Sequence, residues 1–99
     1  MVSIRWTKQA VDDLKSIAEY IRKDSKKYAI IQINRIRSRT QILKKFPNSG
    51  RIVPEVNNPK VRELINGNYR IIYEVRSSKR IDILTVHHSA RMIKPERIK

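Results

Sequence analysis

The stretch KVRELINGNYRIIYEV, residues 60–75, decides the fold because it predicts a β-hairpin. Its second half alternates apolar and polar side chains with the period of two that is typical of a β-strand. Asn66-Gly67 is a strong signal for a tight turn, so strands are expected over 60–66 and 68–75. One face of the second strand should present Tyr69, Ile71, Tyr73 and Val75, and the other Arg70, Ile72 and Glu74.

Arg70 places a permanent positive charge in the middle of this strand. A guanidinium stays protonated in proteins, and burying it without partners is strongly unfavourable. Two explanations are open. Arg70 could form an internal ion pair with Glu63, Glu74 or Glu55, or it could bind a phosphate through its bidentate guanidinium geometry.

The N-terminal half predicts one strand and two helices. VSIRW, residues 2–6, alternates as a short strand, and Thr7 stands where a helix N-cap belongs. Apolar residues then recur at helical spacing over about 8–24 and again over about 28–45. The short connection between these helices favours an antiparallel hairpin.

A proline-containing loop and a last strand complete the expected architecture. FPNSGRIVPEVNNP, residues 46–59, is predicted to be a loop, and RIDILTVHH, residues 80–88, a strand. The order βααβββ predicts an α+β fold, with a helical hairpin packed on one face of a mostly antiparallel four-stranded sheet. We expect a single domain over residues 1–99, with a basic tail from about residue 92.

The charge of the chain is strongly unbalanced, with 23 Lys and Arg against 9 Asp and Glu, a net charge of +14. Such a protein is attracted to polyanions, among which nucleic acid, ribosome and acidic protein are all open. Acidic residues on the first helix argue against an anionic membrane. Without an apolar leader or membrane span at hand, a cytoplasmic protein is expected.

Common catalytic motifs such as GxGxxG, the P-loop and HExxH are absent from the sequence. There is no cysteine, and the adjacent His87 and His88 would point to opposite faces of a strand, so neither a metal site nor a cofactor is expected. Either histidine could transfer a proton or contact a phosphate; an ordinary strand-end histidine is the alternative.

Four arginines suggest a phosphate site. Arg62 and Arg70 belong to neighbouring strands, Arg51 to the preceding loop, and Arg91 follows the last strand. If they meet on the sheet face opposite the helices, they form a cationic patch that can clamp phosphates.

Four segments, in order along the chain, resemble the RelE/ParE superfamily of type II toxin–antitoxin toxins. They are AVDDLKSIAEYI (10–21), FPNSGRIVPE (46–55), REL with GNYRIIYEV (62–75) and VHHSAR (86–91). The resemblance covers about residues 4–93 and implies a growth-inhibiting toxin neutralised by a cognate antitoxin. An acidic or amphipathic antitoxin segment would suit a protein of charge +14.

The superfamily implies two mechanisms. RelE-like members cut mRNA on the ribosome without a metal, whereas ParE-like members inhibit DNA gyrase and have no nuclease chemistry. The strand arginine of RelE-like toxins matches Arg70, and Arg91 stands where a C-terminal arginine is expected. The lysine pair and C-terminal tyrosine of RelE are not matched, so His88 or His87 would move protons.

We therefore favour ribosome-dependent mRNA cleavage from the sequence, with gyrase inhibition as the alternative and a non-toxic nucleic-acid-binding domain as the third possibility. The candidate residues are Arg70, His88 and Arg91 for catalysis, and Arg51, Arg62 and His87 for phosphate or RNA binding.

Overall fold

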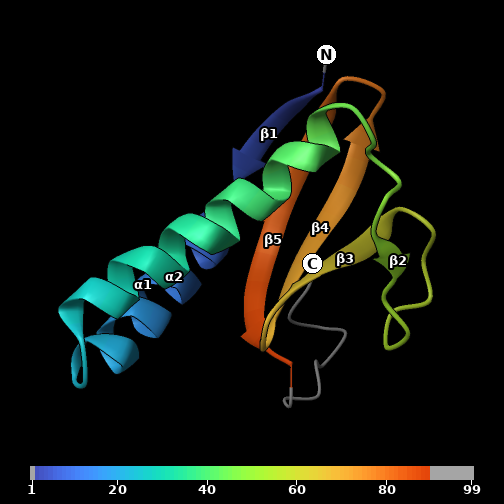
Figure 1. The fold of residues 1–99 in the computed structure, drawn as a ribbon. Helices are drawn as coiled ribbons and strands as arrows, with labels where there is room; N and C mark the ends of the chain where they lie inside the picture. Colours follow the sequence, from blue (N-terminus) through green and yellow to red (C-terminus); the bar gives the residue numbers. More distant parts are fainter. Residues whose placement is uncertain (1, 90–99) are drawn as a thin grey trace.

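Two helices cover one face of a five-stranded sheet in the computed structural model, which describes residues 2–89 (Figure 1). The elements are β1 (Ser3–Trp6), α1 (Lys8–Arg22), α2 (Lys26–Arg39), the 3₁₀ helix η1 (Thr40–Lys44), β2 (Arg51–Ile52), β3 (Val61–Asn66), β4 (Tyr69–Ser77) and β5 (Arg80–His88). The α+β class and the helical hairpin are confirmed. The count of four strands is wrong, because Arg51–Ile52 leave the predicted loop and pair with β3.

The sheet has the order β1-β5-β4-β3-β2, so the first and last strands of the chain lie side by side. β1 runs parallel to β5, and the other neighbours are antiparallel. The parallel pair requires a crossover, which the helical hairpin begins and the β2–β4 region completes. Within residues 2–89, no helix is long and apolar enough to cross a membrane.

Serine and threonine caps fix where the helices begin. Thr7 accepts a hydrogen bond from the Ala10 backbone N–H and donates to the Ile83 carbonyl, at 3.2 and 2.8 Å. Ser25 accepts from the Tyr28 N–H at 3.0 Å, so α2 begins at Lys26, two residues before the prediction. The predicted end near residue 45 is also revised, because α-helical bonding stops at Arg39 and continues as η1.

Apolar side chains pack on both faces of the sheet. The main core lies under the helices, where Leu14 and Ile36 meet Ile71 and Tyr73 of β4. A smaller cluster on the opposite face contains the buried residues Val53, Val61 and Ile72, with Val56 and Leu84 packed against them. Residues of the 53–60 loop therefore cover part of the face that the helices leave open, where the sequence predicted a phosphate site.

Candidate functional site

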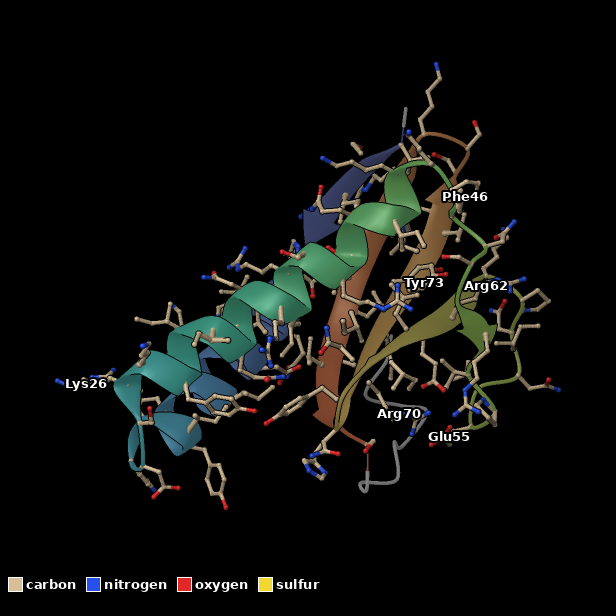
Figure 2. The ribbon with its side chains drawn as sticks, viewed as in Figure 1. Lys26, Phe46, Glu55, Arg62, Arg70 and Tyr73 are labelled. Atoms are coloured by element: carbon tan, nitrogen blue, oxygen red, sulfur yellow. The ribbon has the colours of Figure 1, made fainter. Side chains whose placement is uncertain are left out.

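Arg70 is buried on the helix-free face of β4, where two carboxylates take up its charge. Its Nε donates to Glu63 Oε1 of β3 at 2.6 Å. Its Nη1 and Nη2 donate to Glu55 Oε2 and Oε1 at 2.8 and 2.9 Å, in a bidentate pair with the loop after β2 (Figure 2). The side chain is 7% exposed, so Arg70 is an internal ion pair, as one of the two sequence explanations proposed.

A second arginine extends this arrangement to the surface. Glu63 is fully buried and also accepts from Nε of Arg51, its register partner on β2. We call Arg51, Glu55, Glu63 and Arg70 the Arg70 network. Its two cations and two carboxylates sum to no net charge. Hydrogen bonding to Glu55, and then to Glu63, raises the pKa of Arg70 above its ordinary value against the opposing effect of burial.

Arg62 does not join this network, so the expected meeting of the arginines on one face is wrong for this residue. Arg62 is the register partner of Tyr73, and it therefore lies on the face opposite Arg70. Its guanidinium donates to the carbonyls of Pro59 at 3.0 Å and Gly50 at 2.9 Å. Arg62 thus ties the ends of the covering loop to the sheet (Figure 2).

The two histidines lie at the end of β5 beside a cleft. His87 is nearly buried and is the register partner of Arg70, whereas His88 is exposed and meets the Tyr69 ring edge-on at 5.7 Å between centroids. The cleft, of about 610 Å³, is lined by Asp13, Ser16, Ile17, Tyr20, Tyr69, Val86, His87 and His88. Arg91 lies outside the described residues. Within residues 2–89 no cluster of three or more metal-ligating side chains occurs.

Tyr73 has a structural role that the sequence did not reveal, because its alternation marked it only as a core residue. Its hydroxyl donates to the Pro47 carbonyl at 2.8 Å and accepts from the Gly50 N–H at 3.0 Å. The side chain is fully buried. One phenol thereby fastens both ends of the PNSG turn to the sheet, and the turn leads directly into β2 and the Arg70 network.

We expect Tyr73→Phe to lower the free energy of unfolding by about 1–3 kcal/mol, because a buried donor and a buried acceptor lose their partner. Burial is the largest cause that raises the pKa of Tyr73 from its ordinary 10.0. Above that pH, unfolded tyrosine ionises before the folded one does. The stability that Tyr73 contributes is therefore complete below about pH 10 and is lost as the pH rises through the folded pKa.

Urea unfolding followed by circular dichroism at about pH 8 and about pH 11 tests both parts. Tyr73→Phe should be the less stable protein at the lower pH and should lose less stability than the parent between the two. Equal alkaline losses in the two proteins would contradict the assignment.

Three comparisons place the chain among known proteins. Residues 4–93 match the family model described as "ParE toxin of type II toxin-antitoxin system, parDE". The chain is 35% identical over 86 residues to "Putative toxin Y4kP" of Sinorhizobium fredii (strain NBRC 101917 / NGR234), covering 87% of this chain and 86% of that protein. It also resembles the solved structure "Chromosomal ParDE TA system from P. aeruginosa", with a TM-score of 0.74 and 26% identity.

The structural match covers 89% of this chain and 96% of the solved one. The RelE/ParE resemblance is thus confirmed, and the partner of such a toxin is a cognate antitoxin. The neutralised Arg70 network, rather than an open cationic site, is what the described residues present on the helix-free face. The chain belongs to the ParE toxin family of type II toxin–antitoxin systems.

Proposed function

We propose that this toxin stops growth by inhibiting DNA gyrase, as ParE-like members do, and that it does not cut RNA. The observation that carries the proposal is the Arg70 network. A nuclease of the RelE-like kind needs the strand arginine at the scissile phosphate. Here that arginine makes three hydrogen bonds to two carboxylates. The match of residues 4–93 to the ParE toxin family supports the same mechanism.

Energetics support this mechanism further. If Arg70 turned to a phosphate, the fully buried Glu63 would lose its most buried partner, and Glu55 its bidentate one. Breaking a buried ion pair in this way typically costs about 3–5 kcal/mol. The two freed carboxylates would also repel an approaching phosphate. A substrate phosphate would therefore have to compensate for a loss comparable to a large part of a small domain's stability.

Ribosome-dependent mRNA cleavage is the second candidate, and one observation favours it. His87, His88 and Tyr69 line the same cleft, so two imidazoles and a phenol are available for proton transfer. However, none of the described residues that line the cleft is Lys or Arg. The positive charge that stabilises a cleaving phosphate would have to come from elsewhere in the chain.

Parallel measurements on cells and purified components separate the two mechanisms. After induction without antitoxin, we expect DNA breaks and a damage response first, while protein synthesis continues. Purified toxin should inhibit supercoiling by gyrase and leave mRNA on programmed ribosomes intact. Early translational arrest with cleaved mRNA and intact DNA would instead establish the RNA-cleaving mechanism.

We expect His88→Ala to keep growth inhibition within about threefold of the parent, because His88 is exposed and gyrase inhibition uses no proton transfer. If His88 were the general acid or base of a nuclease, its loss would reduce cleavage by about 10²- to 10⁴-fold. The assay compares toxicity at matched protein levels, with circular dichroism to verify folding. A folded, non-toxic His88→Ala protein would refute the expectation, and Lys8→Ala, at another exposed position, serves as the control.

A further inference from the structure

The middle of the chain carries positive charge without any negative charge. From Ser25 to Pro54 the sequence contains no Asp or Glu. Its cations are Lys26, Lys27, Arg35, Arg37, Arg39, Lys44, Lys45 and Arg51. This segment forms α2, η1 and the turn before β2, between the positions of Lys26 and Phe46 (Figure 2). Its outer surface therefore attracts acidic ligands more strongly than an average face of the protein.

Large apolar side chains are exposed within the same segment. Ile42 and Phe46 are 40% and 61% exposed, and they follow one another by one helical turn. With Gln41, Lys44 and Lys45 they line a shallow hollow on η1. A second shallow hollow begins one turn earlier on α2, and its lining residues are Ile31, Asn34, Arg35, Ser38, Arg39 and Asn66. We call the two hollows together the α2–η1 groove.

The rim of this groove is partly held in place by the sheet. Arg39 Nε donates to the Ile65 carbonyl at 3.2 Å, and Asn66 Nδ2 donates to the Arg35 carbonyl at 3.1 Å. These bonds fix the end of β3 against α2. A ligand in the groove would therefore meet a surface that loses little conformational freedom on binding.

We infer that the α2–η1 groove binds an acidic, amphipathic segment of the cognate antitoxin. Cations at the rim suit carboxylates, and exposed Ile42 and Phe46 suit apolar side chains spaced three or four residues apart. Duplex nucleic acid would use the cations but offers no apolar side chains for the floor of the hollows. From Ile31 to Phe46 the groove runs about 25 Å, the length of a helix of about 16 residues.

The inference rests on the antitoxin partnership of the family and is independent of the choice between gyrase and ribosome. Its failure and the failure of the proposed function are therefore seen in different assays.

The probe is a synthetic 18-residue peptide with Leu at i, i+3, i+4 and i+7 spacing and Glu on the other face. A scrambled peptide of the same composition and a 20-base-pair DNA duplex are compared with it. We expect the full-length toxin to bind the amphipathic peptide at least about tenfold more tightly than the scrambled peptide. Binding is measured by fluorescence anisotropy at about 150 mM salt, where generic charge attraction is screened.

Matched variants locate the site. Lys44→Glu/Lys45→Glu and Phe46→Ser should each weaken peptide binding by about tenfold or more. Lys15→Glu/Lys79→Glu makes the same change in net charge at exposed positions outside the groove, and Ile52→Ser removes an exposed apolar side chain elsewhere. Both controls should stay within about threefold of the parent, and thermal melts verify that every variant is folded.

Three outcomes would overturn the inference. The first is equal weakening by the groove and control charge reversals, which indicates generic attraction to the +14 protein. The second is no preference for the amphipathic over the scrambled peptide. The third is DNA binding that depends on the groove while peptide binding does not.

Discussion

Arg70→Met is expected to lower the free energy of unfolding by about 3–5 kcal/mol, although Met fills much of the same space. The change leaves Glu63, whose side chain is fully buried, with Arg51 as its remaining ion-pair partner within residues 2–89. It also removes the bidentate partner of Glu55 and so loosens the loop that covers the helix-free face. Urea unfolding of the purified protein, followed by circular dichroism, measures the loss.

Two further variants show whether the buried charge causes this loss. Arg51→Met removes the exposed cation of the same network and should cost about 0–1 kcal/mol, as exposed ion pairs do. Arg70→Met/Glu63→Leu removes the buried cation together with a buried carboxylate, so it should be more stable than Arg70→Met alone. If the single and double variants lose the same stability, a stranded carboxylate is not the cause.

The central hairpin could be predicted from the sequence because its signals are local. Alternation along β4 correctly assigned Ile71 and Tyr73 to one face and Arg70 and Ile72 to the other. The turn after Asn66 correctly marked the boundary between β3 and β4. Local rules of this kind need no knowledge of the rest of the chain.

The position of Arg62 was also encoded locally, although the sequence interpretation missed it. Asn66 pairs with Tyr69 across a two-residue turn, and counting back along both strands pairs Arg62 with Tyr73. Arg62 and Arg70 are then on opposite faces, since directly paired residues share a face. The turn length alone was therefore enough to exclude a common patch.

The partners of Arg70 could not be chosen from the sequence. Glu63, Glu74 and Glu55 all lay within reach in principle. The choice depends on the path of the loop, because the pairing of Arg51–Ile52 with β3 brings Glu55 over the sheet. Two residues give too short a pattern to predict a strand, and no local signal shows that a loop will cover a sheet face.

Gly50→Ala is expected to destabilise the fold by about 2–4 kcal/mol, because the added methyl group has no space. A Cβ at Gly50 would lie 2.5 Å from the Glu63 carbonyl oxygen and 2.7 Å from the Tyr73 hydroxyl oxygen. The first contact is the backbone of β3, which is held by strands on both sides. Relief therefore requires β2 to move away, which weakens the hydrogen bond from Gly50 N–H to Tyr73 and the pairing of Arg51 with Glu63.

Gly67, the other glycine, is the matched control because it is needed for conformation rather than for space. Its φ is +57°, and a Cβ there would meet nothing within 4 Å. Asn tolerates this left-handed conformation better than Ala does. Gly67→Asn should therefore cost less than Gly67→Ala, whereas Gly50→Asn should be at least as damaging as Gly50→Ala. Unfolding free energies of the four variants test this order, and a rescue of position 50 by Asn would show that its role is conformational after all.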